Sequence, residues 1–174
     1  MEEQLWSACK NGKVEEVRRL IQNSEINTDW QNDKDYLHGT PFYIACSRGH
    51  TEIVKLLLND KRVDINKTNV QGWTPFFIAY NKGYLEIMEY ILASRNDVDL
   101  TIEWLGRKRE LVIDFARKKG DTEKASWESE EGCQKRKRDC LKIVELLESF
   151  ERNPIETRFK LRLKLGLAGK KSII

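Results

Sequence analysis

The side chains that most often act as nucleophiles, general bases or zinc ligands are few in this chain of 174 residues. They are four cysteines and two histidines, namely Cys9, Cys46, Cys133, Cys140, His38 and His50. A thiolate nucleophile needs a base beside it, and a structural zinc site needs four ligands in short, paired spacings. The cysteines show no such pairing and are expected to be reduced structural thiols, so we predict no metal site.

The chain also lacks the short motifs with which enzymes bind phosphate groups or activate a serine. It contains no G-x-x-x-x-G-K-[ST], no G-x-G-x-x-G after a strand, no G-x-S-x-G and no H-E-x-x-H. We therefore predict that the protein is not an enzyme, and that it has no catalytic residues, no cofactor and no small-molecule substrate.

Two stretches of the chain match one another without a gap, and each is typical of two short helices joined by a glycine. They are residues 40–58 and 74–92. In each, a threonine can cap the first helix, a proline suits the first helical position, and the glycine allows a positive φ at the joint. Helices this short are not stable alone in water, so each pair must bury its apolar face against a similar pair.

Alanine and glycine pairs continue this register toward both ends of the chain: Ala8/Gly12, Ala45/Gly49, Ala79/Gly83 and Ala116/Gly120. The alanines follow one another at steps of 37, 34 and 37 residues, a period that predicts a solenoid of helix pairs. The pattern T-P-hydrophobic-x-x-A-x-x-x-G-[H/Y], followed by I-V-x-L-L-L and D-I-N, resembles the ankyrin repeat over roughly residues 4–150. The resemblance implies an all-α solenoid of about four antiparallel helix pairs with β-turn fingers.

Two domains are expected, a repeat array over residues 1–150 and a C-terminal capping helix with a tail over residues 151–174. The fourth repeat carries a polar insertion at residues 122–139, which we expect to be mobile at its centre. Its basic cluster, residues 135–138, could be a nuclear localisation signal or a phosphate-binding patch; the alternative is a solvated extension of the following helix.

The residues after the array carry the signals of a helix start. Asn153 can cap the helix, Pro154 suits its first position, and Glu156 lies three residues after the cap. The alternation of apolar residues over residues 159–167 leaves an edge strand or a membrane-surface segment open. Within the expected helix, two arginines should pair with acidic residues of the last repeat. These are Arg158 and Arg162, with Glu145, Glu148 or Glu151 as partners.

The first loop between repeats is five residues longer than the second and carries two aromatic residues, Trp30 and Tyr36. Trp30 either tucks back onto the neighbouring repeat or contacts a partner. His38 is expected in a turn, and His50 at a helix start. Asn66 is similar to the site in ankyrin-like repeats that asparaginyl hydroxylases modify; the alternative is that it only ties down its loop by hydrogen bonds.

The resemblance also implies that the fingers, and the two residues before each joint glycine, face a concave groove. Basic residues occupy many of these positions, with two aromatic residues among them. We expect the partner-binding residues to be Trp73, Tyr36, Arg48, Lys82, Arg107, Lys108, Lys119 and Trp30, with Trp73 as an exposed apolar anchor. Basic residues at helix ends also complement the helix dipole, which is the alternative explanation for the lysines.

We therefore predict a protein-interaction module that binds an acidic protein or peptide in a basic concave groove. The alternative is a polyanion, either nucleic acid or a phosphoinositide head group; of the two classes we expect the protein. The net charge of +3 is mild, and no apolar run is long enough to span a membrane. We expect a monomer in the cytoplasm, with the nucleus as the alternative if residues 135–138 act as a localisation signal.

Overall fold

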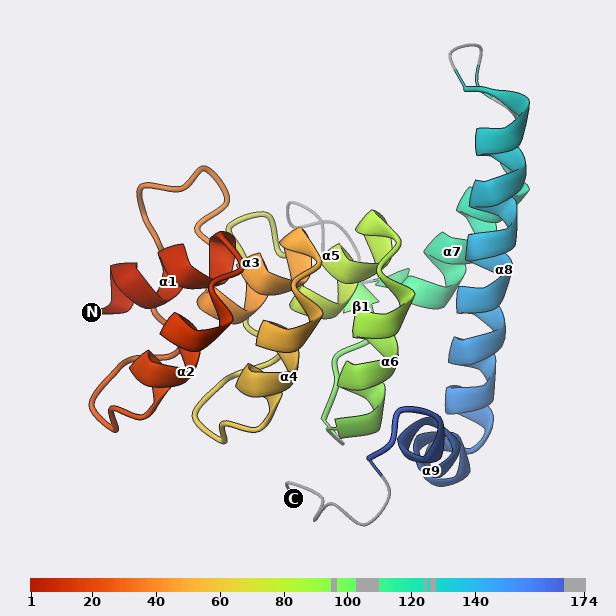
Figure 1. Ribbon diagram of the computed structural model, residues 1–174. Coiled ribbons are helices and arrows are strands. Elements are labelled where there is room, and N and C mark those ends of the chain that lie inside the picture. Colours follow the sequence, from red (N-terminus) through yellow and green to blue (C-terminus); the bar gives the residue numbers. More distant parts are fainter. Residues whose placement is uncertain (95–96, 103–109, 124, 126–127, 168–174) are drawn as a thin grey trace.

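The computed structural model describes the chain except for residues 95–96, 103–109, 124, 126–127 and 168–174. Short helices stack side by side in pairs along the molecule (Figure 1). The first three pairs are α1 (Glu2–Lys10) with α2 (Val14–Ile21), α3 (Pro41–Arg48) with α4 (Thr51–Leu58), and α5 (Pro75–Lys82) with α6 (Leu85–Ser94). Helices α1, α3 and α5 contact one another in one row, and α2, α4 and α6 in another, which confirms the predicted all-α solenoid.

The helices begin and end at the residues that the repeated motif predicts. The side chains of Thr40 and Thr74 each accept a hydrogen bond from the backbone N–H three residues on, so both act as N-caps. Gly49 and Gly83 follow the first helix of each pair with φ of 76° and 78°. Because an L-residue with a Cβ is strained in this left-handed conformation, glycine is the residue that ends these helices at low cost.

A ring from the following repeat covers the joint glycine in two of the repeats. A Cβ added to Gly12 would lie 2.9 Å from Cε1 of His50, and one added to Gly49 would lie 2.8 Å from Cζ of Tyr84. At Gly83 a Cβ would meet no atom of the described residues within 4 Å. The joints at Gly12 and Gly49 therefore need glycine both for φ and for space, whereas the joint at Gly83 needs it for φ alone.

The core runs along the stack between the two rows of helices. Its largest fully buried side chains include aromatic residues of α3 and α5, namely Phe42, Tyr43, Phe76 and Phe77. Trp6 of α1 is also buried, and its indole Nε1 donates a 2.8 Å hydrogen bond to the carbonyl of Gly39, just before the next repeat begins. This contact joins the first repeat to the second through a polar atom that burial would otherwise leave unpaired.

The fourth helix pair departs from the others. It consists of α7 (Val112–Asp121) and α8 (Glu130–Arg152), and it follows a two-stranded antiparallel sheet of β1 (Thr101–Ile102) and β2 (Glu110–Leu111). Helix α8 begins at Glu130, inside the expected insertion and ten residues before Cys140, with Ser129 as its N-cap, which agrees with the alternative of a solvated helix extension. The basic cluster at 135–138 thus lies within a helix, and α8 extends beyond the rest of the stack (Figure 1). Part of the expected mobile centre, residues 124 and 126–127, lies outside the described residues.

Gly120 does not end its helix, unlike the glycines of the first three repeats. It lies inside α7, and it is not among the described residues with positive φ. A Cβ at Gly120 would lie 3.3 Å from Cβ of Cys140 on α8. In this repeat the glycine therefore allows two helices to approach closely, a different role for the same register position.

The segment after the array forms a helix, α9 (Pro154–Lys164), and not an edge strand. Asn153 caps it by accepting a hydrogen bond from the backbone N–H of Glu156, as predicted. Helix α9 packs against α6 and α8. For the two arginines that we predicted to pair with acids of the last repeat, the structure shows contacts with the C-terminal end of α6. Nε of Arg158 donates to a carbonyl there, and so does Nη1 of Arg162. The acceptors are the carbonyls of Leu92, at 3.1 Å, and Ala93, at 3.4 Å.

Candidate functional site

The surroundings of the cysteines do not favour catalysis or metal binding. All four cysteines are buried, and burial raises the pKa of the Cys9 and Cys46 thiols, which favours the protonated form over the nucleophilic thiolate. Within the described ranges, no group of three or more His, Cys, Asp or Glu residues could hold a metal ion.

The two histidines lie where the repeat register predicts. His50 is the N-cap residue of α4, and its Nε2 lies 3.1 Å from the carbonyl of Lys10 at the end of α1, so the side chain joins two repeats. His38 lies in the loop before α3 with φ of 48°, and its carbonyl accepts a hydrogen bond from Nε2 of Gln31. Both histidines support loops and helix ends.

A hollow of about 330 Å³ lies between the first long loop, α3 and the end of α5. We call it the finger hollow, and it is lined by Asp35, Tyr36, Leu37, Ile44, Ser47, Arg48 and Lys82. Three of the predicted partner-binding residues, Tyr36, Arg48 and Lys82, come together in it. They reach it from three different elements, so only the folded stack of repeats can form this site.

The rim of the finger hollow is basic and aromatic. The Tyr36 side chain is 84% exposed, and the side chains of Arg48 and Lys82 are exposed as well. Within the described part of the chain, neither basic residue forms an ion pair. Such residues are available to an incoming carboxylate, because no acid of the same chain has to be displaced first.

The floor of the finger hollow is apolar, with one acidic residue at its edge. Leu37 and Ile44 form the apolar part. An oxygen of Asp35 accepts a hydrogen bond from the backbone N–H of Leu37, and its other oxygen lies 3.9 Å from Nζ of Lys10. Asp35 thus shapes the loop through a local turn, and Lys10 balances part of its charge.

Our sequence reasoning missed Asp35, Leu37 and Ile44 as parts of this site. An aspartate two residues before Leu37 is a recognisable Asx-turn signal, so the loop shape could have been anticipated. For Ile44, only 5% of the side chain is exposed. Its position on the inner helix indicates a core residue. No signal in the sequence shows that the small exposed part of this side chain lines the hollow.

Trp73 is not the exposed anchor that we predicted. It is half-buried and packs against the core, with its ring centroid 5.4 Å from that of Phe77 at an edge-on angle of 79°. Its indole Nε1 is buried. Trp30 is likewise half-buried against the core, which agrees with the alternative that it tucks back onto its neighbour. Neither tryptophan lines the finger hollow.

Among the remaining predicted basic residues, the structure describes Lys119, which does not line the finger hollow. Lys119 on α7 is half-buried, and its Nζ lies 5.5 Å from the ring centroid of Tyr80. Arg107 and Lys108 lie outside the described residues. Among the described basic residues of the predicted set, the structure therefore brings Arg48 and Lys82 together at the finger hollow and places Lys119 elsewhere.

Asn66 ties two loops together through both atoms of its amide. Its Nδ2 donates to the carbonyl of Asp97 at 2.6 Å, and its Oδ1 accepts from the backbone N–H of Asp99 at 2.8 Å. These contacts agree with the structural alternative for Asn66. Hydroxylation at this residue stays a prediction.

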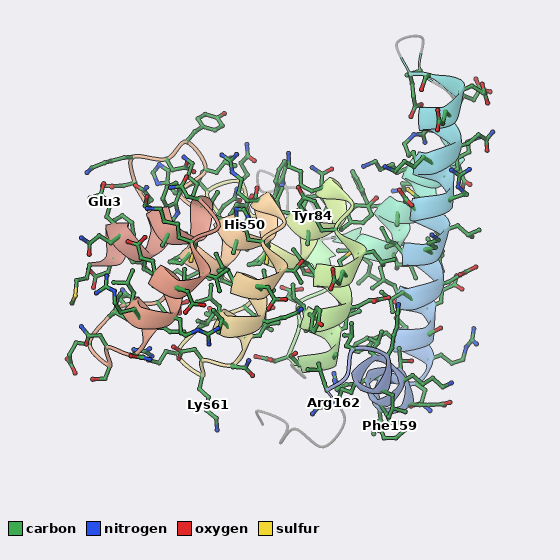
Figure 2. All side chains as sticks on the ribbon, in the orientation of Figure 1. Glu3, His50, Lys61, Tyr84, Phe159 and Arg162 are labelled. Carbon is green, nitrogen blue, oxygen red and sulfur yellow. The ribbon has the colours of Figure 1, made fainter. Side chains whose placement is uncertain are left out.

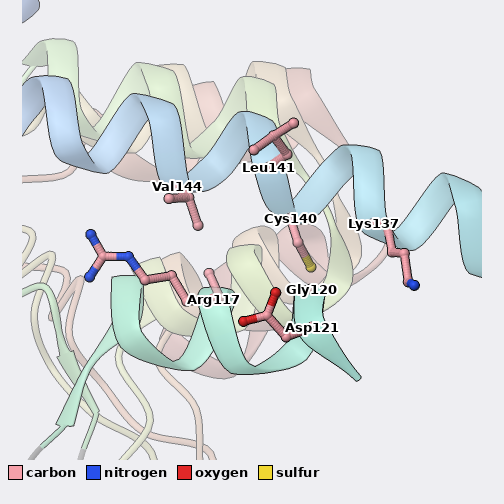
Figure 3. A pocket seen from close by; sticks show the side chains of 8 residues that line it. Arg117, Gly120, Asp121, Lys137, Cys140, Leu141 and Val144 are labelled. Carbon is pink, nitrogen blue, oxygen red and sulfur yellow. The ribbon is translucent and has the colours of Figure 1, made fainter. Parts of the chain in front are cut away.

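A second hollow, of about 310 Å³, lies between α7 and α8 (Figure 3). It is lined by Ala116, Arg117, Gly120, Asp121, Lys137, Cys140, Leu141 and Val144. Burial raises the pKa of the Cys140 thiol, so its nucleophilic form is disfavoured. Arg117 is engaged at 2.8 Å by Glu148 of α8. Of the predicted partner-binding residues that the structure describes, none lines this hollow, but Lys137 of the basic cluster at 135–138 does.

Taken together, these features define a class of protein: a helical-repeat solenoid of short helix pairs, with an open hollow formed by a loop and neighbouring repeats. A family model described as ankyrin repeats (3 copies) matches residues 5–102. The chain belongs to the ankyrin-repeat family. The match covers the three regular helix pairs and the finger hollow, whereas α7, α8 and α9 lie beyond it.

Ankyrin repeats are generally protein–protein interaction modules, and the family is typically non-enzymatic. The chain is accordingly a repeat module of the kind that binds protein partners. In the part of the chain that the structure describes, no helix is both long and apolar enough to cross a membrane.

Proposed function

We propose that the finger hollow binds an acidic segment of a partner protein. The observation that carries this proposal is the convergence of Arg48, Lys82 and the 84% exposed Tyr36 on one hollow. Arginine and tyrosine are enriched among the residues that dominate binding energy at protein interfaces. An ankyrin-repeat array that binds proteins has in this hollow a surface suited to carboxylates.

Each part of the hollow has a distinct role in this proposal. The guanidinium group of Arg48 can take a carboxylate in a two-point hydrogen bond, while the ammonium group of Lys82 adds a less directional charge. The apolar floor, Leu37 and Ile44, takes an aliphatic side chain beside the acidic residue. Tyr36 covers the bound segment from the loop side.

The experiment selects binders from a display library of random peptides, using the intact chain as bait. We expect the recovered peptides to be enriched in aspartate and glutamate. Their affinity should fall about tenfold or more for the double variant Arg48→Glu/Lys82→Glu. Tyr36→Ala should mainly raise the dissociation rate, because the exposed ring contacts the bound segment directly.

The matched control is Arg19→Glu/Lys61→Glu, which changes the net charge equally at two exposed residues outside the hollow. Equal losses for the two double variants would mean that only net charge matters, and this would overturn the proposed site. Recovered peptides without an excess of acidic residues would overturn the partner class.

The alternative function, polyanion binding, is favoured by one observation on α8. Lys135, Lys137 and Arg138 are exposed on this helix, whereas Arg136 is engaged by Glu128 at 3.0 Å. Binding of a heparin fragment or a DNA duplex, with a steep loss of affinity as salt increases, would support this alternative. Loss of that binding in Lys135→Glu/Lys137→Glu but not in Arg48→Glu/Lys82→Glu would assign it to α8.

A further inference from the structure

Tyr36 is the tyrosine that the fold leaves open to solvent. The chain has five tyrosines, and this one is 84% exposed, whereas Tyr43, Tyr80 and Tyr90 are buried. Tyr84 is half-buried, with its ring over a joint glycine. An enzyme that modifies a phenol on the folded protein would therefore reach Tyr36 before any other tyrosine.

The loop around Tyr36 is held in place by its neighbours. The backbone N–H of Leu37 donates to a carboxylate oxygen of Asp35. Nζ of Lys34 pairs at 3.1 Å with Glu3 of α1, which Figure 2 shows at the N-terminal end of the array. Within the described part of the chain, Tyr36 itself makes no hydrogen bond through its backbone or its side chain. This residue can therefore enter an active site without losing a hydrogen bond of its own.

The segment that precedes Tyr36 is acidic, which suits a tyrosine kinase. Asp33 and Asp35 lie three residues and one residue before the phenol. Protein kinases select their substrates partly by the pattern of charge around the acceptor, and many tyrosine kinases accept acidic residues on its N-terminal side. Exposure and sequence context thus both favour Tyr36 as a phosphate acceptor.

Two basic side chains share the finger hollow with Tyr36. Arg48 at the end of α3 and Lys82 at the end of α5 line it, and neither forms an ion pair within the described ranges. Figure 2 shows His50 and Tyr84, each two residues after one of these basic residues, on the upper side of the array. The loop that bears Tyr36, drawn in orange between α2 and α3 in Figure 1, rises on the same side. A phosphate on this loop would therefore lie near two available cations.

We propose that phosphorylation of Tyr36 closes the finger hollow to the acidic segment of a partner. This inference rests on the proposed function and adds its regulation. The phenolic oxygen attacks the γ-phosphorus of a nucleoside triphosphate bound to a tyrosine kinase. The bond from this phosphorus to the bridging oxygen breaks, the nucleoside diphosphate leaves, and the phenolic proton passes to the catalytic base of the kinase.

The phosphate then competes with the partner for the same two cations. It carries about −1.5 to −2 charges at pH 7 and three acceptor oxygens. The guanidinium group of Arg48 can bind two of these oxygens, and the ammonium group of Lys82 adds its charge. Because the ring of Tyr36 is exposed, it can turn toward them. Asp35 opposes the phosphate with one negative charge, which Lys10 at 3.9 Å offsets in part, so the balance favours the phosphate in the hollow.

The first measurement tests the modification. A tyrosine kinase is chosen for its activity on a synthetic peptide of residues 30–42 and is then applied to the folded full chain. We expect one phosphate by intact mass in the parent and none in Tyr36→Phe. A folded chain that stays unmodified while the peptide is phosphorylated would overturn the proposal.

The second measurement tests whether the phosphate reaches the two cations, and it needs no partner peptide. The second pKa of the phosphate, about 6 when free, is followed by a ³¹P NMR titration of the phosphorylated chain. We expect this pKa to lie about 0.5 unit or more below its value in phosphorylated Arg48→Gln/Lys82→Gln, because nearby cations favour the dianion. Asp35 raises the pKa and Lys10 lowers it, and both are present in the two proteins compared. Equal pKa values would show that the phosphate does not enter the hollow and would contradict the closure.

The third measurement compares the affinity of the phosphorylated and unphosphorylated chains for acidic peptides recovered from the display library. We expect phosphorylation to weaken binding about tenfold or more. The control is Arg19→Gln/Lys61→Gln, which removes two positive charges at exposed residues outside the hollow and should change the affinity less than about twofold. Unchanged affinity after phosphorylation would overturn the closure. A library that yields no acidic peptide would instead overturn the proposed function, and the ³¹P titration would still decide whether the phosphate occupies the hollow.

Discussion

Gly49 is subject to two separate constraints, its left-handed backbone and the ring of Tyr84 beside its Cα. Alanine at this position should cost on the order of 1–2 kcal/mol for the backbone alone, and more for the displaced ring. At Gly83 only the first cost applies, since a Cβ there meets no atom of the described residues within 4 Å. We therefore expect Gly49→Ala to lower the urea midpoint more than Gly83→Ala.

A third variant separates the two costs. In the background of Tyr84→Ala, the substitution Gly49→Ala should cost about as much as Gly83→Ala does in the parent, because the ring no longer occupies the space. Equal midpoints for Gly49→Ala and Gly83→Ala in the parent would contradict the role that we assign to Tyr84.

His38 offers the opposite prediction, a stabilising substitution. It is the described non-glycine residue with positive φ, at 48°. Because an L-residue in this region costs about 1–2 kcal/mol and glycine costs roughly 0.5–1 kcal/mol in chain entropy, His38→Gly should stabilise by up to about 1 kcal/mol. The comparison is Tyr36→Gly in the same loop, which gains no backbone relief and should be neutral or destabilising. A lower thermal midpoint for His38→Gly would contradict this interpretation.

At this scale, sequence reasoning identified residue types and positions but not the direction of each side chain. The turn position of His38 and the helix start at His50 followed from the register. The burial of Trp73 did not, because the register places this residue at a finger whether its ring faces solvent or Phe77. A ring at a loop position becomes half-buried only through a contact between elements, and a single repeat motif does not encode that contact.

Helix α9 has a buried and an exposed apolar face, and matched substitutions distinguish them. Leu161 is 6% exposed and Leu163 is 52% exposed. Leu161→Ala should cost about 2–4 kcal/mol, because it leaves a cavity against the array. Leu163→Ala should change the free energy of unfolding by less than about 0.5 kcal/mol. Chemical denaturation of the two variants measures the difference, and similar values would show that α9 does not pack as a cap.

The start of α9 could be predicted from Asn153, Pro154 and Glu156, because capping depends on neighbours in sequence. The acceptors of its arginines could not, since they lie 66 and 69 residues away at the end of α6. Carbonyls in the last turn of a helix have no partner within that helix, so they attract a guanidinium group as an acidic side chain does, and any residue type can supply them. The sequence offered the extension of α8 only as one of several alternatives, because the first turns of this helix are too polar to show an apolar stripe.

For the whole molecule, stability should be local rather than uniform, because each helix pair contacts mainly its neighbours. A destabilising change at one end should therefore open that end first. In the variant Leu161→Ala, we expect amide hydrogen exchange in α6, α8 and α9 to speed up about tenfold or more, and exchange in α1 and α2 to change less than about twofold. Equal acceleration in all helices would mean that the chain unfolds as one cooperative unit.

The overall fold could be predicted because the sequence motif of one helix pair recurs several times along the chain. Each copy of the threonine, proline, alanine and glycine pattern supports the same repeat boundaries, so the prediction of the fold does not depend on any single copy. The finger hollow had no such support, since it depends on the long loop around Asp35 and Tyr36, which occurs once. A site built by a unique loop across repeated elements needs the three-dimensional structure.

The rings over the joint glycines also bear on how this array can change over evolution. A ring from the next repeat lies over Gly12 and over Gly49, so a substitution at either glycine should cost less stability when the residue at position 50 or 84 becomes smaller at the same time. Among homologous sequences we expect these pairs to covary. Among the described residues, no ring lies over Gly83, so this position should drift to asparagine, which tolerates positive φ, without a matching change elsewhere. The joint at Gly83 is therefore the position where a whole repeat could be inserted or deleted during evolution without breaking a contact between a joint glycine and a ring.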